Sequence, residues 1–316
     1  MSRRQPRMTS SGQPIRHTPL GTKMWNYRGY YLMFVPVVLF VIIMHYWPML
    51  GVRFAFYNYR AFGAKTFIGL EHFRTMFGEK GFWTAFKNTL ELSIWKLLIT
   101  TLTAVVASVF LNEMNQMFAK KTLQTVIYLP HFMSWAVVAG IFSMILSPNA
   151  ANGMVNGMLQ DMGLKTQMFL QDKTLWRPIF YIINIWKETG WGTIIFLATL
   201  SGVNPELYEA ADIDGATRMQ KIWYVTVPAL ANTIVVVLIL NLAKVMNLFE
   251  SVFVLYNSAV MDVSDVISTF IYAKAFAANP NYGYSTAVGL FKSLVGGALV
   301  LICNALSKKV RGRGII

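Results

Sequence analysis

Five polar residues lie close together in an otherwise apolar segment at about residues 230 to 256: Asn241, Lys244, Asn247, Glu250 and Ser251. On a helix they share about half of the circumference, and Leu242, Val245, Met246, Phe249 and Val252 occupy the other half. Charged groups at membrane depth are costly and usually face the interior of a helix bundle or a wet cavity. We therefore expect the polar half to face a translocation cavity. The alternative is that Lys244 and Glu250 snorkel or pair with other spans.

Tryptophan and lysine side chains in other apolar segments could complete a binding site for a sugar. Trp186, Lys187 and Trp191 lie within one such segment. Sugars present apolar C–H faces and a ring of hydroxyls, so their sites combine flat aromatic surfaces with amide and charged groups. The alternative for the two tryptophans is an interfacial aromatic belt. If the lysines of the spans share one cavity, they favour a carboxylated sugar; these are Lys96, Lys187, Lys244 and Lys292.

Other chemistries find little support in the sequence. No glycine-rich phosphate loop ends in Lys-Ser or Lys-Thr, so we expect this chain to bind no ATP by that mechanism. No catalytic triad or pair of carboxylates has a persuasive spacing. Cys303 is the single cysteine and the four histidines are scattered, so neither a disulfide framework nor a metal site is expected. The basic residues are spread over tails and loops, and nucleic acid is not an expected partner.

Composition places these residues in a membrane protein. The 316 residues are 55% hydrophobic and 13% charged, with a mean hydropathy of +0.46, whereas about a quarter of the residues of a soluble domain are charged. Six apolar runs are long enough to cross a bilayer, which predicts an all-α polytopic fold without strands. The six predicted transmembrane helices lie at about residues 29 to 50, 86 to 111, 123 to 147, 177 to 200, 230 to 256 and 285 to 306.

The segments outside these spans set the expected topology. Residues 69–77 and 155–162 mix apolar and polar positions at helical spacing, which suits short interfacial helices. Residues 1–28 form a basic tail predicted to be disordered, and residues 307–316 form a second basic tail. With both termini cytoplasmic, the inner segments carry fourteen basic residues and the outer loops nine. That orientation satisfies the positive-inside rule.

A polar stretch between the fourth and fifth spans carries the signals of a short capped helix. Asn204 is a plausible N-cap, and Pro205 suits the first helical position. Glu206 lies in the first turn, where the helix dipole favours an anion, and Gly215 can adopt the left-handed conformation that ends a helix. These signals predict a helix of about ten residues. On their own they also fit a capped helix in an ordinary surface loop.

A resemblance gives this stretch a more specific interpretation. Glu209-Ala210-Ala211, followed by Gly215, Ile222 and Pro228, resembles the EAA motif of ABC-importer permeases. Flanking blocks resemble the carbohydrate branch of that family, closest to the permeases for alginate-type or uronide-type oligosaccharides. The blocks are Met24 to Arg28, Pro48 to Gly51, Gly190-Trp191-Gly192, Leu200 and Tyr282 to Ala287. The resemblance extends over nearly the whole chain from about Met24.

The resemblance implies a role for the polar stretch and a set of partners. Loop 201–229 would form a cytoplasmic coupling helix that docks on an ATPase subunit, through Glu206, Glu209, Ala210, Ala211, Asp214 and Gly215. The machine would contain a second, often different permease, two ATPases that hold ATP and Mg, and an external solute-binding protein. It would import an oligosaccharide through the bacterial cytoplasmic membrane. Three alternatives remain at this point: a permease for another solute, an ion-coupled secondary transporter and a membrane-bound enzyme.

Overall fold

The computed structural model describes residues 20–60 and 65–311, in two compact units, residues 1–53 and 54–316. Most of the first predicted tail and the end of the second therefore lie outside the described residues. The first unit is helical: α1 (Leu20–Asn26), α2 (Arg28–Val41), a π-helical turn (Ile42–Tyr46) and α3 (Trp47–Met49). The first predicted span falls on the helical run that begins at Arg28 and ends at Phe56.

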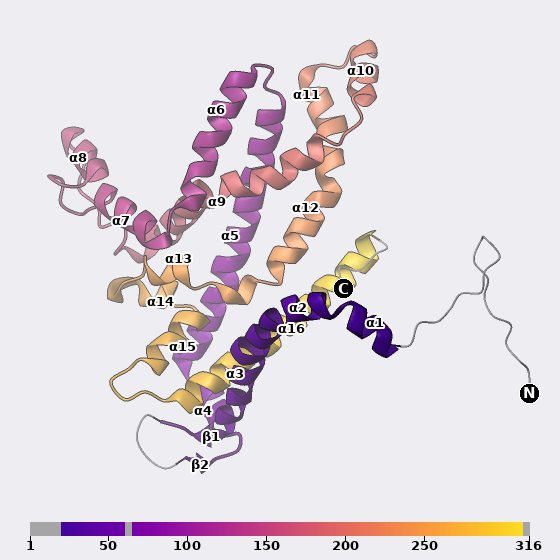
Figure 1. The fold of residues 1–316 in the computed structure, drawn as a ribbon. Coiled ribbons are helices and arrows are strands. Elements are labelled where there is room, and N and C mark those ends of the chain that lie inside the picture. The colour runs from indigo at the N-terminus through magenta and orange to yellow at the C-terminus, as the bar shows by residue number, and fades with distance from the viewer. Residues whose placement is uncertain (1–19, 61–64, 312–316) are drawn as a thin grey trace, which may run out of the picture. The chain divides into compact units, whose positions relative to one another are not determined.

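Four long helices form the frame of the second unit: α5 (Lys80–Asn112), α9 (Lys173–Leu200), α12 (Val227–Leu242) and α16 (Tyr282–Arg311). α5 packs along α9, and α12 contacts α5, α9 and α16 (Figure 1). Ala104, Phe196, Leu200 and Leu230 are buried where α5, α9 and α12 meet. Gly190 allows α9 to approach α6 closely, because a Cβ atom there would lie 2.1 Å from the Ile127 carbonyl oxygen.

Two of the predicted spans are broken. The third consists of α6 (Met117–Tyr128), a 3₁₀ turn (Leu129–Phe132) and α7 (Trp135–Ile145), with a bend of 102° between its two halves. Pro130 lies in the turn, and its ring is incompatible with the interior of a regular helix. We call residues 129–134 the elbow. The span predicted at 123–147 is therefore a bent pair of helices.

The fifth predicted span was wrong as a continuous helix. α12 ends at Leu242, a 3₁₀ turn covers Val245–Asn247, and the short helix α13 begins at Glu250 and ends at Phe253. Ser93 of α5 stabilises this interruption, since its Oγ atom donates to the Val245 carbonyl at 2.8 Å. The apolar helical run instead begins earlier than predicted, at Arg218.

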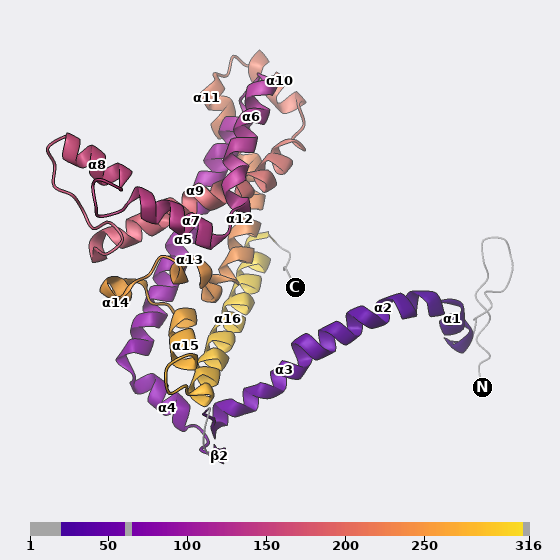
Figure 2. The ribbon, with the colours of Figure 1, turned by 60° about the vertical axis from the view of Figure 1, so that its left-hand side comes forward.

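Shorter elements complete the second unit. The expected short helices are present as α4 (Glu71–Gly78) and α8 (Met154–Asp161), and α14 (Met261–Ser264) and α15 (Ile267–Ala275) follow α13. The absence of strands was wrong in one place, because Tyr57–Asn58 (β1) and Thr66–Phe67 (β2) pair antiparallel, with Tyr57 opposite Phe67. Figures 1 and 2 show α10 (Glu206–Ile213) and α11 (Arg218–Lys221) at the end of this unit opposite to α4 and the two strands.

The helices fit a polytopic membrane protein. Four described helical runs are long and apolar enough to cross a bilayer, and the bent pair around the elbow would make a fifth. α9 has the length, with 28 residues, but it carries several charged side chains. The all-α class is confirmed, whereas the number of six spans stays a prediction.

Candidate functional site

A cavity of about 620 Å³ lies between α5, α7, α9, α12 and the interrupted segment after α12. Its lining mixes aromatic, amide, hydroxyl and charged side chains with aliphatic ones. The polar and aromatic members are Ser93, Lys96, Thr100, Thr101, Trp135, Glu188, Trp191, Phe196, Asn241, Lys244, Asn247, Phe249, Glu250 and Ser251. Such a lining can hold a polar solute that also offers apolar surface.

The five polar residues that follow one another between positions 241 and 251 all line this cavity. They do not reach the cavity as one face of a helix, which is how the sequence analysis grouped them, because the helix ends at Leu242. The chain turns there: the Lys244 N–H donates to the Asn241 carbonyl, and the Asn247 N–H donates to the Lys244 carbonyl, each at 2.9 Å. Val245, which the periodicity placed on the opposite half, also lines the cavity. The interruption thus exposes consecutive residues to one space.

Helix α5 supplies three polar lining residues that the sequence analysis missed, in addition to Lys96, which was grouped with the lysines expected to favour a carboxylated sugar. Ser93, Lys96, Thr100 and Thr101 face the cavity from this helix. Their spacing is that of one helical face. A search for polar residues three and four apart would have found this face, although the apolar residues between them make it weak in the sequence.

The two tryptophans proposed for the cavity differ in position. Trp191 lines it, and Trp135 of α7 adds a second indole. Trp186 does not line it: its ring meets the edge of the Phe142 ring, with centroids 5.5 Å apart. The Lys96 ammonium lies 5.7 Å from the centre of the Trp135 ring, within the range of a cation–π contact.

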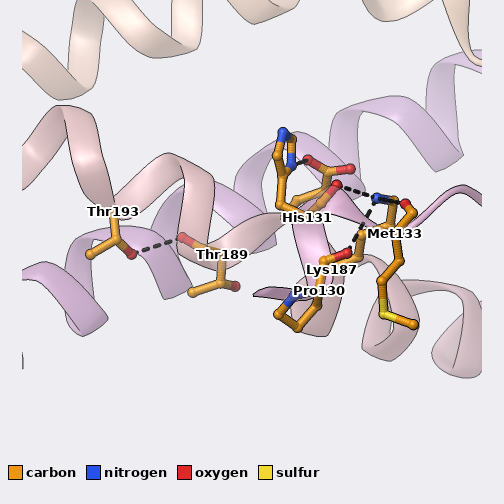
Figure 3. A network of polar contacts seen from close by, with 7 residues as sticks. Pro130, His131, Met133, Lys187, Thr189 and Thr193 are labelled. Carbon is orange, nitrogen blue, oxygen red and sulfur yellow. Dashed lines mark hydrogen bonds and ion pairs between the residues drawn. The ribbon is translucent and has the colours of Figure 1, made fainter. Parts of the chain in front are cut away.

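Lys187 has a structural position and lies outside the lining of the cavity. It is buried, and its Nζ donates to the carbonyls of His131 at 2.8 Å, Met133 at 2.7 Å and Pro130 at 3.5 Å (Figure 3). These carbonyls belong to the elbow, where the chain leaves helical geometry; the Pro130 carbonyl also accepts from the Met133 N–H at 3.2 Å. The expectation that Lys187 belongs to the cavity was therefore wrong, and its cation completes the hydrogen bonding of the elbow.

The charges of the cavity are fewer than the four lysines suggested. Lys292 donates to Ser268 Oγ at 3.0 Å and is not part of the lining. Lys96 and Lys244 remain, together with Glu188 and Glu250. Glu188 Oε2 lies 3.1 Å from His131 Nδ1. Over the described parts of the chain, neither Lys96 nor Lys244 forms an ion pair within 4.0 Å, so both ammonium groups are available to a solute.

At the far end of α12, local signals build the loop that carries the EAA resemblance. Asn204 Oδ1 accepts from the Glu206 N–H at 3.1 Å, as expected of a cap. Gly215 has a φ of +74°. The Gly215 N–H donates to the Asp212 carbonyl at 3.1 Å and the Ala216 N–H to the Ala211 carbonyl at 2.9 Å. This is the Schellman pattern that ends a helix at a left-handed residue.

Three contacts attach α10 and its loop to the long helices. Lys221 Nζ pairs with Asp212 Oδ1 at 2.6 Å, and the Tyr208 hydroxyl lies 3.1 Å from Thr226 Oγ1. Arg218 Nε pairs with Glu113 Oε2, at the end of α5, at 3.3 Å. Of the residues proposed for docking, Ala211 is half-buried, and the others are exposed: Glu206, Glu209, Ala210, Asp214 and Gly215. Helix α10 is thus tied to the bundle on one side and open on the other.

The described residues hold no cluster that suggests metal chemistry. No group of three or more His, Cys, Asp or Glu side chains within residues 20–60 and 65–311 could bind a metal ion.

Comparison with known proteins places the whole chain. The model of a family described as binding-protein-dependent transport system inner membrane component matches residues 104–312. Protein LplB of Bacillus subtilis is 38% identical over 289 residues, covering 90% of each chain. The polygalacturonan/rhamnogalacturonan transport system permease protein YteP of the same organism is 37% identical and covers 93% of this chain and 92% of its own length.

A solved structure has the same fold over almost the entire chain. A chain in the crystal structure of a bacterial alginate ABC transporter, in complex with an alginate pentasaccharide-bound periplasmic protein, superposes with a TM-score of 0.85. The two chains are 36% identical, and the match covers 94% of this chain and 99% of the other. The family match, the relatives and the shared fold agree with one another. The chain belongs to the binding-protein-dependent transport system inner membrane components, the permease subunits of ABC importers.

Proposed function

We propose that this chain imports an acidic oligosaccharide, as one of two transmembrane subunits of an ABC importer. The observation that carries the proposal is the cavity of about 620 Å³, which joins two indoles, two amides and two lysines without ion-pair partners in the described chain. The space is large enough for several sugar rings of a chain. The EAA loop lies at the other end of the helix that lines this cavity, so one element, α12, connects the two sites.

Trp135 and Trp191 are suited to the apolar faces of sugar rings. Stacking of an indole on such a face removes apolar area from water, while the ring hydroxyls stay free to hydrogen-bond. Asn241 and Asn247 each offer a carbonyl acceptor and an amide donor, which matches a hydroxyl that both donates and accepts. These groups supply recognition of a sugar without requiring a charge on it.

Lys96 and Lys244 extend the proposal to a carboxylated sugar. An ammonium in a partly dehydrated cavity attracts a carboxylate more strongly than it would in water. The names of two similar proteins support this choice, since YteP is a permease for polygalacturonan and rhamnogalacturonan and the solved relative is an alginate transporter. The carboxylates of Glu188 and Glu250 would repel an anionic sugar, so its binding depends on where the charges lie in the cavity and not on their sum.

The EAA loop would receive the energy for transport from partner subunits. With both termini in the cytoplasm, α10 faces an ATPase that binds ATP and Mg, and Glu209 is the polar contact on its exposed side. Closure of two such ATPases would move the α10 helices of this chain and of a second permease. Because Arg218 and Tyr208 tie the loop to α5 and α12, that movement would reach the walls of the cavity. A solute-binding protein would deliver the sugar from outside.

Reconstitution tests the proposal directly. The complete complex, with both permeases, the ATPases and the binding protein, is placed in proteoliposomes and offered an oligogalacturonate or the same oligosaccharide with its carboxylates reduced to alcohols. We expect ATP-dependent uptake of the uronide and stimulation of ATP hydrolysis by it. Uptake of the reduced sugar alone would contradict the acidic substrate. Uptake driven by a proton or sodium gradient without the ATPases would contradict the importer.

Lys96→Gln sharpens the assignment of the carboxylate contact. Loss of one charge–charge interaction in the cavity should raise the KM for the uronide about tenfold and change that for the reduced sugar little. Lys292→Gln is the matched control, because this lysine also lies within a long helix but contacts Ser268 away from the lining. Equal effects of both variants on both sugars would remove Lys96 from the proposed contact.

A further inference from the structure

His131 joins the elbow to two residues that line the cavity. Its ring stacks on the indole of Trp191, with centroids 4.7 Å apart and an interplanar angle of 8°. Its Nδ1 atom lies 3.1 Å from Glu188 Oε2. His131 itself is not one of the lining residues, whereas Trp191 and Glu188 both are. The imidazole therefore lies behind the surface that a solute would touch.

The partner of Nδ1 determines where the imidazole carries a proton. An ionised carboxylate has acceptors only, so a hydrogen bond at this distance requires the proton on Nδ1. The backbone around His131 is fixed as well, because its carbonyl accepts from the buried Lys187 ammonium at 2.8 Å (Figure 3). The Lys187 hydrogen bond thus holds the backbone of His131 in place, independently of the contact between the imidazole and Glu188.

Glu188 has two side chains near it that could donate a hydrogen bond to its carboxylate. Lys96 lines the same cavity from α5, and His131 lies in the elbow. In the structure the carboxylate pairs with His131 and not with Lys96, which has no ion pair within 4.0 Å over the described residues. A carboxylate left without His131 would be attracted to the Lys96 ammonium, and it would also repel an anionic sugar.

We propose that His131 is a specificity-determining residue for anionic sugars, because its hydrogen bond holds the Glu188 carboxylate away from Lys96. This inference rests on the proposed function of the cavity and assigns a role to a side chain outside its lining. His131 is a positioning residue: it acts through Glu188 on the cation that receives the carboxylate of the sugar. The ring stack with Trp191 is a separate contribution, to the orientation of the indole.

Substitution by phenylalanine separates these two contributions. His131→Phe keeps a flat ring that can stack on Trp191 and removes the hydrogen bond to Glu188. Glu188→Gln removes the negative charge while keeping an acceptor for the Nδ1 proton. The double variant removes both the donor and the charge. Asp262→Asn is the control, since it removes a carboxylate from an exposed ion pair with Lys173 that is not part of the cavity.

The test measures uptake of oligogalacturonate and of its carboxyl-reduced form by each complex in proteoliposomes. The unchanged binding protein gives all complexes the same loading preference, so the ratio of the two uptake rates is compared with that of the wild type. We expect His131→Phe to lower the ratio of uronide to reduced sugar about tenfold, the size of one charge interaction. The double variant should return the ratio to the wild-type value or above it. Asp262→Asn should leave it unchanged.

The outcomes separate this inference from the proposed function. Uptake of the reduced sugar alone by the wild type would end the proposal of an acidic substrate. Even then, Glu188→Gln should raise the ratio of uronide uptake to reduced-sugar uptake, because it removes a negative charge from the cavity. The same ratio in all complexes would overturn the role of His131. A loss in His131→Phe that affects both sugars equally, and that Glu188→Gln does not reverse, would also overturn it, because that result describes a packing defect.

Discussion

The EAA loop and the cavity are built by different kinds of interaction. In the loop, the contacts that shape the helix ends join residues within ten positions of one another: the Asn204 cap, the Gly215 turn and the Lys221–Asp212 pair. Around the cavity, the decisive contacts join distant segments, such as Ser93 with Val245 and Lys187 with the elbow. Local signals are visible in a sequence, whereas the second kind appears only after the helices have packed.

The difference has a functional reason. In the proposed function α10 is pushed by a partner subunit, so it must keep its shape on its own, and caps give it that stability. Around the cavity the helices are interrupted. Irregular backbone at membrane depth is tolerated only where protein groups or the water of a cavity hydrogen-bond to its N–H and C=O groups. The lysine at the elbow and the serine at the second break provide that satisfaction.

The largest expected effect comes from closing the gap between α9 and α6. In Gly190→Ala, the new Cβ atom would lie 2.1 Å from the Ile127 carbonyl oxygen, so the two helices must separate. We expect a loss of about 3 kcal/mol or more in stability, seen as a lower melting temperature of the purified complex. Gly140→Ala, where nothing lies within 4 Å of the new atom, is the control. Equal melting temperatures for the two variants would refute the close packing.

A substitution at the turn tests the loop. Gly215→Val places a β-branched residue at a φ of +74°, which costs about 1–2 kcal/mol in the folded loop. We expect uptake per ATP hydrolysed to fall about tenfold, while ATP hydrolysis by the partners continues. Gly202→Ala, in the same loop but with ordinary backbone geometry and a 3.5 Å contact, should couple normally. Normal coupling in the valine variant would disprove the role of this turn.

The two tryptophans of α9 sharpen the boundary of the cavity. Trp191→Ala should raise the KM for the transported sugar about fivefold, the effect of losing about 1 kcal/mol of stacking. Trp186→Ala, five residues away on the same helix and outside the lining, should leave the KM within twofold. If Trp186→Ala has the larger effect, the lining has been assigned to the wrong face of α9.

The smallest effect concerns a carboxyl group between α14 and α15. Burial raises the pKa of Asp265 above its ordinary value of 3.8, although the Thr269 hydroxyl donates to its Oδ1 at 2.5 Å. A raised pKa in the folded state means that stability is present below the ordinary value and decreases as the pH rises through the folded pKa. Asp265→Asn should remove that decrease, which amounts to less than about 1 kcal/mol of the free energy of unfolding at pH 7.

Melting temperatures between pH 4 and pH 7 measure this effect. Asp214→Asn, in the exposed end of α10, is the control and should leave the pH profile of the wild type unchanged. A pH profile that is the same for the wild type and Asp265→Asn would show that the buried carboxyl does not contribute. The pair of variants thus contrasts a charge buried by tertiary packing with one in the locally built loop.

Sequence reasoning reached the loop almost completely. The cap at Asn204 and the left-handed Gly215 follow from residue type, because the backbone geometry at these positions selects those side chains. It also identified the membrane class and the short helices α4 and α8. It failed at the third and fifth spans, since apolar length does not reveal a break. Pro130 lies in the turn of the third span, where the chain bends by 102°.

The cavity residues illustrate the same limit. Asn241, Lys244, Asn247, Glu250 and Ser251 were grouped on the assumption of one continuous helix, whereas the helix ends at Leu242 and an irregular segment brings them to one cavity. Lys187 was placed in the cavity because a charge in a span usually faces water, but its ammonium binds carbonyls of the elbow. A sequence shows that a charge needs a partner, without showing whether the partner is a solute or another part of the chain.

The sequence by itself determined what depends on neighbouring residues: the apolar helices, the ends of α10 and the turn at Gly215. Only the tertiary structure decided which lysines face the cavity, where the spans break and how His131 meets Glu188 and Trp191. The physical reason is distance along the chain. Backbone geometry and capping act over a few residues, whereas the pairing of a buried charge depends on helices that are brought together by folding.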